Sequence, residues 1–351
     1  MKKIILTGGG TAGHVTPNLA LLPGLREAGY EIFYVGSKTG IEKDIIAKAG
    51  LTYYGISAGK LRRYLDLRNI SDIFRVLKGY GEAAKLIREL KPDVVFSKGG
   101  FVAAPVVAAA KMAKVKTVIH ESDMTPGLAN RLSIPFADMV CVNFPETVSH
   151  IRGGRAVLTG SPIRPELFCG SKKEGAALCA FHDTKPVILA VGGSLGSVTV
   201  NKALRASLGL LRKDFNVAHV CGKGNAAPEA EGPGYRQFEY VNEELPHLFA
   251  YADAVVSRAG ANFIFEILAL QKPNLLIPLS IKASRGDQIL NAESFRRQGF
   301  SEVLEEEELS PEKLAAAVRS LYKNREKYRE AMAVCPMKNG ADEVLKVIQG
   351  V

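Results

Sequence analysis

The sequence predicts an α/β protein made of two similar halves, each a parallel β-sheet with helices on both faces. Strand and helix patterns alternate along the chain, and a unit of strand, glycine turn and helix occurs near the amino terminus and again near residue 190. The 351 residues also exceed the usual size of one domain. We therefore expect two Rossmann-like domains facing each other across a cleft.

Composition narrows the class of protein. Hydrophobic content of 47% and charged content of 23% are typical of globular proteins, and the net charge of +10 indicates an anionic partner. The most apolar segment, 101–113, is too short to cross a bilayer, and Met1 leads directly into a strand without a signal peptide. We expect a cytosolic protein. The cysteines are odd in number and lack a C-x-x-C pair, which predicts free thiols.

The first glycine turn carries the strongest local signal. Gly8, Gly10 and Gly13 follow the apolar run 4–6 and precede a helical pattern over 18–28. Glycine turns bring backbone N–H groups close to an anion, and phosphate is the natural ligand. The glycine spacing also fits a dinucleotide fingerprint, but no acidic residue ends the second strand, 32–35, so we do not expect NAD. A tight turn without a ligand is the alternative.

His14 follows this turn directly. A histidine titrates near neutral pH and can remove a proton from a hydroxyl, so His14 is a candidate general base. Many loop histidines are only solvated or cap a helix, which is the alternative interpretation.

Further strands complete a parallel sheet in the first half and place polar or glycine-containing loops at its carboxyl edge, where ligands bind. The expected strands after the second are 53–56, 94–96, 116–120, 139–142 and 156–158. The expected helices include 41–49 and 69–90. The latter combines apolar and basic residues, which favours a helix lying on anionic lipid or an ordinary amphipathic helix packed on the sheet.

Two prolines between 160 and 165 indicate a linker, after which the pattern repeats. The expected strands of the second half are 187–191, 216–221, 238–241, 254–257 and 275–278. Helices are expected up to 211, from 261, from 289, over 311–332 and over 341–348. No Asp-x-Asp occurs, so we expect a diphosphate stabilised by helix dipoles, backbone N–H groups and basic side chains, without a metal or other cofactor.

Three glycine turns, two halves and the missing Asp-x-Asp match the GT-B glycosyltransferase plan. Over essentially the whole chain the sequence resembles the MurG family, whose members transfer N-acetylglucosamine from UDP-N-acetylglucosamine to undecaprenyl-diphospho-muramoyl-pentapeptide in peptidoglycan synthesis. The motifs that carry the resemblance are Gly-Gly-Gly-Thr-Ala-Gly-His at 8–14, Lys-Gly-Gly-Phe at 98–101, His-Glu at 120–121, Gly-Leu-Ala-Asn at 127–130, Gly-Ser-Pro-Ile-Arg at 160–164, Gly-Gly-Ser-Leu-Gly at 192–196 and Arg-Ala-Gly at 258–260.

The resemblance implies roles for individual residues. His14 matches the histidine proposed near the reaction centre, with Glu121 and Asp123 as alternative bases, and Glu266 would hold the ribose hydroxyls. The residues that would contact UDP-N-acetylglucosamine are Thr11, Ala12, Gly13, Asp123, Arg164, Ser194, Val241, Ala261, Asn262, Phe263, Ile264, Phe265, Glu266 and Gln288. Three residues depart from the pattern of many members, namely Phe101, Asp123 and Asp287.

The resemblance also implies an acceptor whose lipid tail stays in the membrane. We expect an acceptor and membrane-side domain, 1–160 joined by the helix 336–351, and a UDP-sugar domain, 161–335. Attachment to the cytoplasmic face of an anionic membrane would be peripheral. The residues expected to provide it are Arg62, Arg63, Arg68, Phe74, Arg75 and Lys78. The alternatives are a UDP-N-acetylglucosamine 2-epimerase, another GT-B enzyme with this donor, or a binding protein without catalysis; we expect no nucleic-acid partner.

Overall fold

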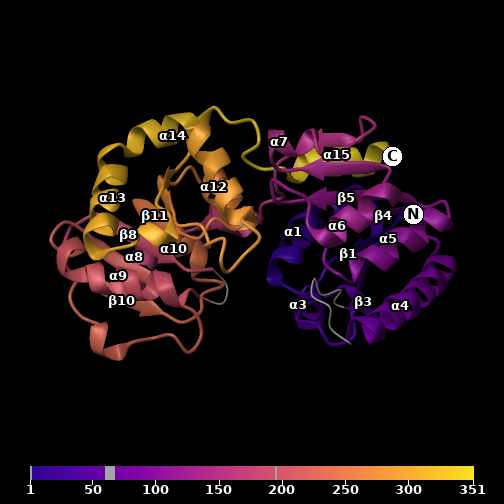
Figure 1. Ribbon diagram of the computed structural model, residues 1–351, viewed down its shortest axis with the longest axis horizontal. Coiled ribbons are helices and arrows are strands. Elements are labelled where there is room, and N and C mark those ends of the chain that lie inside the picture. Colours follow the sequence, from indigo (N-terminus) through magenta and orange to yellow (C-terminus); the bar gives the residue numbers. More distant parts are fainter. Residues whose placement is uncertain (1, 60–67, 194–195) are drawn as a thin grey trace. The chain divides into compact units, whose positions relative to one another are not determined.

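The chain divides into two compact units, each with its own parallel sheet (Figure 1). The structure is a computed structural model that describes residues 2–59, 68–193 and 196–351. Unit 1 comprises Met1–Arg164 and Asn339–Val351, and unit 2 comprises Pro165–Lys338. The predicted α/β class with two Rossmann-like sheets is confirmed.

The described residues of unit 1 form a seven-stranded sheet of order β3-β2-β1-β4-β5-β6-β7, in which all neighbouring strands are parallel. The order reverses between β1 and β4. Ligands of open parallel sheets bind outside the carboxyl ends of the strands at such a reversal. The strands are β1 (Lys2–Thr7), β2 (Tyr30–Ser37), β3 (Thr52–Ile56), β4 (Val94–Ser97), β5 (Lys116–Glu121), β6 (Met139–Val142) and β7 (Ala156–Leu158).

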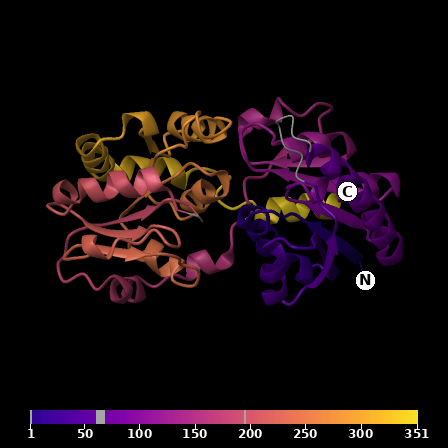
Figure 2. The same ribbon diagram turned by 60° about the horizontal axis from the view of Figure 1, so that its bottom comes forward.

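Helices cover both faces of this sheet because successive side chains of a strand point to opposite sides (Figure 2). Ile4 and Leu6 pack toward α1–α3 and α15, whereas Ile5 packs toward α4 and α5. The helices of unit 1 are η1 (Ala12–His14), α1 (Thr16–Ala20), α2 (Leu22–Glu27), α3 (Glu42–Lys48), α4 (Arg68–Leu90), α5 (Ala103–Met112), α6 (Leu128–Ser133), η2 (Ile134–Phe136), α7 (Pro145–Val148) and α15 (Ala341–Gly350).

The expected single helix over 18–28 is wrong. It is divided into α1 and α2, which meet at Leu21. Pro23 has no backbone N–H to continue the helical ladder, so it stands in the first turn of a new helix. The expected long helix over 69–90 is confirmed by α4.

The last helix, α15, belongs to unit 1 although the preceding residues belong to unit 2. Val344 and Ile348 are buried in the same core as Ile4. The Gly340 N–H donates to the Ser161 carbonyl over 2.8 Å. A Cβ on Gly24 would lie 2.2 Å from a methyl carbon of Leu345, so α2 and α15 approach closely. The carboxyl terminus is therefore part of the amino-terminal core.

The described residues of unit 2 form a six-stranded parallel sheet of order β10-β9-β8-β11-β12-β13, which reverses between β8 and β11. The strands are β8 (Val187–Val191), β9 (Asn216–Val220), β10 (Tyr235–Phe238), β11 (Ala254–Ser257), β12 (Asn274–Leu276) and β13 (Glu302–Val303). The expected strand 238–241 is wrong, because the chain leaves the sheet after Phe238 and Tyr240 is 69% exposed.

Helices again cover two faces of the sheet. Leu204 of α9 and Leu314 of α13 share a core with β8 and β11, while α11 packs on α12 through Phe265 and Phe295, whose ring centroids are 5.3 Å apart. The helices are η3 (Pro165–Cys169), α8 (Lys172–Cys179), α9 (Val198–Leu211), η4 (Pro228–Ala230), α10 (Leu245–Tyr251), α11 (Ala261–Ala269), α12 (Asp287–Arg297), η5 (Glu306–Glu308), α13 (Pro311–Lys323) and α14 (Arg325–Ala333). The expected single helix 311–332 is wrong, since Asn324 separates α13 from α14.

Candidate active site

Two glycine turns meet at the carboxyl edge of the unit 1 sheet, where the strand order reverses. The turn after β1 contains Gly9 and the turn after β4 contains Gly100. A Cβ on Gly100 would lie 2.4 Å from the Gly9 carbonyl oxygen, and Gly100 has φ +87°. Only glycine satisfies both the contact and the left-handed backbone. The two turns therefore form one continuous backbone surface.

Glu42 reaches the first glycine turn, which the sequence did not suggest. Its carboxylate accepts hydrogen bonds from the Gly10 N–H (3.2 Å) and from the Ser37 N–H and hydroxyl (2.9 and 2.5 Å). Burial opposes ionisation, but these hydrogen bonds outweigh it and hold the pKa of Glu42 below its usual value. Glu42 thus places a carboxylate at the first glycine turn, and its oxygens already accept hydrogen bonds from Gly10 and Ser37. The only sequence signal was an acidic residue at the start of the helix 41–49.

His14 ends the one-turn helix η1 and is half-buried. Its Nδ1 lies 3.0 Å from the Gly9 carbonyl oxygen and 3.1 Å from the Thr11 hydroxyl. A carbonyl only accepts, so Nδ1 carries the proton and the lone pair is on Nε2. Burial lowers the pKa of His14, and the Lys98 ammonium lowers it further. The ring is thus biased toward the neutral form that a general base needs.

Glu121 lies at the end of β5 and is buried. Its two oxygens accept from the Asp123 N–H (2.9 Å), the Gly127 N–H (3.0 Å) and the Asn130 amide (2.9 Å). Burial and the neighbouring Asp123 carboxylate raise the pKa of Glu121 in spite of these bonds. The carboxyl group therefore organises the loop before α6. Asp123 itself is half-buried at the same edge.

In unit 2 the corresponding edge is held together by Arg258, directly after β11. The guanidinium donates to the Glu306 carboxylate and to the Ser197 hydroxyl, both over 2.7 Å, and to the carbonyls of Ile277 and Pro278. Ser197 caps α9, the helix that follows the glycine turn after β8. Arg258 therefore fixes the start of α9 against the loops after β11 and β12. The motif containing Arg258 was recognised from the sequence, but Glu306 was missed because it lies 48 residues away.

The segment 261–266 forms the start of α11, as predicted. Ile264 and Phe265 are fully buried, whereas Asn262, Phe263 and Glu266 are half-buried. The first intrahelical bond runs from the Ile264 N–H to the Gly260 carbonyl over 3.1 Å. The backbone N–H groups before it point out of the helix start, which favours an anion there. Ile264 and Phe265 can reach a ligand at this end only through their backbone.

Gln288 lies in the first turn of α12 and accepts a hydrogen bond from the Leu279 N–H on its side-chain oxygen (3.0 Å). This contact uses the side-chain oxygen of Gln288, and the NH₂ group is the part of the amide that can donate to a ligand. Val241 is half-buried three residues beyond β10.

The remaining predicted donor contacts are distributed over both units. Thr11, Ala12 and Gly13 are exposed or half-buried in unit 1, and Arg164 is the last residue of its first segment. Ser194 lies outside the described residues. The structure therefore brings the two glycine turns, His14, Glu121 and Asp123 to one edge of unit 1. It brings Arg258, Glu266 and Gln288 to the elements that follow β11 and β12 in unit 2.

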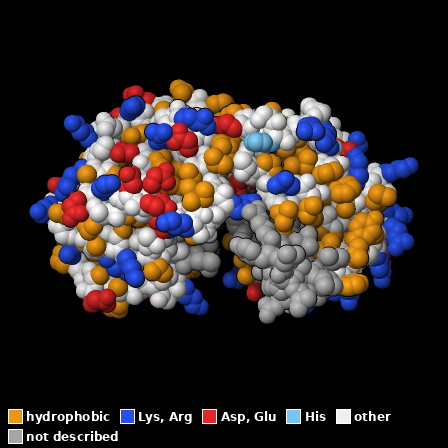
Figure 3. Space-filling view, in the orientation of Figure 1, with side chains coloured by type: hydrophobic (Ala, Val, Ile, Leu, Met, Phe, Trp, Pro, Cys, Tyr) orange, Lys and Arg blue, Asp and Glu red, His pale blue; other side chains and the backbone are white. Residues whose placement is uncertain are grey.

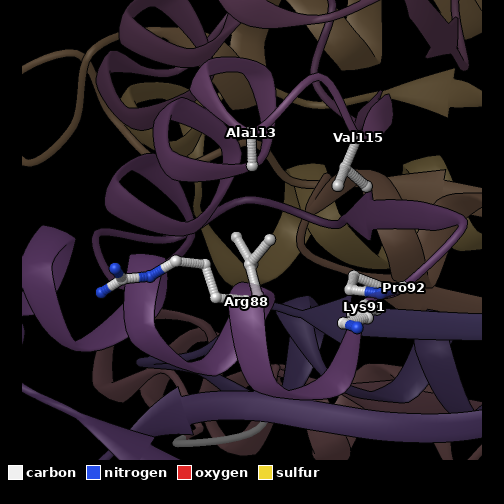
Figure 4. Close-up of a pocket in the computed structure, with 6 residues that line it drawn as sticks. Arg88, Lys91, Pro92, Ala113 and Val115 are labelled. Atoms are coloured by element: carbon white, nitrogen blue, oxygen red, sulfur yellow. The ribbon is translucent and has the colours of Figure 1, made fainter.

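A shallow hollow of about 340 Å³ lies at the opposite, amino-terminal edge of the unit 1 sheet (Figure 4). Arg88, Lys91, Pro92, Ala113 and Val115 line it, and they precede β4 and β5. This hollow is therefore separate from the glycine turns. In residues 2–59, 68–193 and 196–351, no group of three metal-ligating side chains occurs and no helix is long and apolar enough to cross a membrane.

Two parallel sheets with glycine turns at their reversal points are the arrangement expected of a two-domain glycosyltransferase, and the family models assign the chain to this class. The model of the glycosyltransferase family 28 N-terminal domain matches residues 4–142, and that of the family 28 C-terminal domain matches residues 187–348.

The chain is similar to transferases of known name. The UDP-N-acetylglucosamine--N-acetylmuramyl-(pentapeptide) pyrophosphoryl-undecaprenol N-acetylglucosamine transferase of Clostridium tetani (strain Massachusetts / E88) is 58% identical over 99% of this chain and 98% of the relative. The protein of that name from Lachnoclostridium phytofermentans is 59% identical over 100% of this chain and 99% of the relative. The chain belongs to this family, the MurG family, as predicted.

Solved structures agree with the fold. The crystal structure of MurG from Acinetobacter baumannii matches with a TM-score of 0.77 at 25% identity, covering 100% of both chains. A putative UDP-N-acetylglucosamine 2-epimerase from Listeria monocytogenes matches with a TM-score of 0.69 at 12% identity, covering 100% of this chain and 96% of that one. The second likeness concerns the fold alone. The predicted GT-B fold is confirmed.

Proposed function

We propose that the protein is an inverting N-acetylglucosaminyltransferase that moves N-acetylglucosamine from UDP-N-acetylglucosamine to undecaprenyl-diphospho-N-acetylmuramoyl-pentapeptide, converting lipid I to lipid II in peptidoglycan synthesis. The observation that carries this proposal is the identity of 57–59% over essentially the full chain to transferases with this name. The likeness to an epimerase is limited to the fold. The transferase is therefore favoured over the epimerase and over other GT-B enzymes with the same donor.

The experiment that separates these functions is UDP release with and without acceptor. A transferase releases UDP from UDP-N-acetylglucosamine only when the lipid-linked muramoyl-pentapeptide is present. An epimerase instead produces the 2-epimeric sugar without that acceptor. Release of UDP or formation of the epimer at the same rate in both mixtures would exclude the transferase.

In the proposed reaction unit 2 binds the donor and unit 1 supplies the base. The acceptor hydroxyl attacks the anomeric carbon, the bond to the UDP oxygen breaks, and His14 Nε2 takes the hydroxyl proton. The departing diphosphate is stabilised by the backbone N–H groups and dipoles at the starts of α9 and α11. A single displacement inverts the anomeric centre and gives a β-linked product. Glu121 is a weaker candidate base because three protein donors already use its oxygens.

Glu266 is proposed to hold the ribose of UDP. A carboxylate facing two hydroxyls makes charge-assisted hydrogen bonds. Glu266→Ala is expected to weaken UDP binding by roughly 1.5–3 kcal/mol, which raises the dissociation constant about 10- to 150-fold in calorimetric titration. Glu293 of α12, whose side chain is half-exposed and paired with Arg296, offers a control of equal charge, and Glu293→Ala is expected to leave UDP binding unchanged. An unchanged dissociation constant in Glu266→Ala would remove the ribose assignment.

The amino-terminal part of α4 is proposed to attach the protein to the cytoplasmic face of the membrane. Phe74 and Leu77 are 68% and 61% exposed, and Arg75 and Lys78 are exposed beside them. Figure 3 shows hydrophobic and basic side chains next to one another on the described surface of unit 1. Arg62 and Arg63 lie outside the described residues, and Arg68 begins α4. Apolar side chains with flanking positive charges favour an anionic bilayer surface.

Replacing Arg62, Arg63, Arg68, Arg75 and Lys78 with glutamine is expected to abolish co-sedimentation with anionic vesicles and to leave UDP binding unchanged. Each of the five charges contributes about 1 kcal/mol near such a surface. The control variant has the same change in net charge but in unit 2. It replaces five exposed lysines with glutamine, namely Lys172, Lys173, Lys202, Lys213 and Lys327. If both variants sediment alike, attachment does not depend on the α4 region.

A further inference from the structure

Lys98 is a cation buried beneath the glycine turns of unit 1, with 1% of its surface exposed. Its ammonium donates to His120 Nδ1 over 2.7 Å and to the Ser122 hydroxyl. His120 Nε2 lies 3.0 Å from the Gly160 carbonyl oxygen, so Nε2 carries the ring proton and Nδ1 is free to accept. Both acceptors of Lys98 are neutral, so neither neutralises the ammonium.

The backbone connects this ammonium with His14. Lys98 begins the turn in which Gly100 packs against Gly9, and the Gly9 carbonyl oxygen accepts the hydrogen bond of His14 Nδ1. The cation and the imidazole therefore lie on the two turns that contact each other. A positive charge in such a poorly solvated place opposes a second positive charge nearby.

We propose that Lys98 is a positioning residue whose buried charge keeps His14 in the neutral form and so ready to accept the acceptor proton. The proposal rests on the proposed function of His14 as the general base. Lys98 touches neither substrate in this role. It acts on His14 through the electrostatic field of its ammonium at the two glycine turns.

The charges around both groups agree with this role. Burial lowers the pKa of His14 most, and the charge of Lys98 lowers it further, whereas the Gly9 hydrogen bond and the Glu42 carboxylate oppose the decrease. Burial lowers the pKa of Lys98 to about 7, while the groups that oppose this decrease are Glu121, Asp123 and Cys141. His14 titrates below its ordinary 6.5, where Lys98 is mostly protonated. The charge of Lys98 is thus present in the pH range in which it must act.

The test is the titration of His14 in protein with isotope-labelled histidine, followed by NMR without substrate. The chain has six histidines, and the His14 signal is assigned by its loss in His14→Asn. Lys98→Met removes the charge with little change of volume and is expected to move the His14 titration to higher pH. The acidic limb of kcat/KM is expected to move in the same direction. Identical His14 titrations in the parent and Lys98→Met would overturn the proposal.

Two further variants keep the test decisive. Ser122→Ala removes a hydrogen bond of Lys98 but keeps its charge, so the His14 titration is expected to stay where it is; a shift as large as that in Lys98→Met would overturn the electrostatic role. Lys98→Gln is neutral and retains a donor toward His120, and it replaces Lys98→Met if that variant does not fold. A shifted His14 titration with an unshifted kcat/KM limb supports the role of Lys98 and contradicts His14 as the base.

Discussion

Replacing His14 with asparagine is expected to lower the turnover number by about 10²–10⁴-fold, the usual loss when a general base is removed. The asparagine amide can still donate to the Gly9 carbonyl, as Nδ1–H of His14 does in the structure, but it has no basic nitrogen at the position of Nε2. His14→Ala removes both functions. If His14 is the general base, both variants should lose most of the turnover number, with little change in UDP binding.

The alternative is that His14 only stabilises the glycine turn. In that case the asparagine would preserve most of the turnover and only the alanine would lose it, which would contradict the assignment. The pH dependence is a second check. A base works in its neutral form, and burial and Lys98 lower the pKa of His14, so kcat/KM should remain high down to a pH below 6.5 and then fall.

Arg258→Met is expected to destabilise unit 2 by about 3–5 kcal/mol, because it leaves the Glu306 carboxylate without its partner. The two side chains are only 9% and 11% exposed and are 2.7 Å apart. Burial raises the pKa of Glu306, but the Arg258 hydrogen bond and the Ser280 N–H outweigh burial and hold it below its usual value. The variant should therefore also raise the pKa of Glu306. Thermal unfolding followed by calorimetry measures the loss.

A surface pair provides the control for this prediction. Arg329 and Glu326 of α14 are 2.8 Å apart but 38% and 61% exposed, so Arg329→Met is expected to cost less than about 1 kcal/mol. Adding Glu306→Gln to Arg258→Met should recover part of the stability, because the uncompensated charge is removed. Equal effects of Arg258→Met and Arg329→Met would show that the buried pair does not hold the unit 2 edge together.

Much of the fold was predictable from the sequence because buried parallel strands are apolar runs of recognisable length, and glycine turns follow them directly. The predicted boundaries that are wrong lie where a helix or strand ends although the hydrophobic pattern continues. Pro23 divides a continuous helical pattern, and Tyr240 and Val241 continue a strand-like pattern past the end of β10 at Phe238. Hydrophobic periodicity contains no signal for either event.

The candidate site was predictable only where its residues adjoin a turn. His14 ends the glycine turn after β1, Glu121 is the last residue of β5, and Arg258 directly follows β11, so their place at the sheet edge follows from the sequence. Glu42 and Glu306 reach those edges from separate helical turns, and their partners depend on how the chain returns in space. The burial of Lys98 also depends on tertiary packing, since a lysine after a strand is exposed more often than buried.

The most direct test of the proposed function is analysis of the product formed from UDP-N-acetylglucosamine and the lipid-linked muramoyl-pentapeptide in the presence of a chelator. Mass spectrometry and NMR of the purified product are expected to show one added N-acetylglucosamine in β linkage, with UDP released in equal amount. Such a result agrees with a single inverting displacement that needs no divalent metal. An α-linked product, or activity that disappears with the chelator and returns only with a divalent ion, would contradict that mechanism, and the absence of any disaccharide product would contradict the transferase itself.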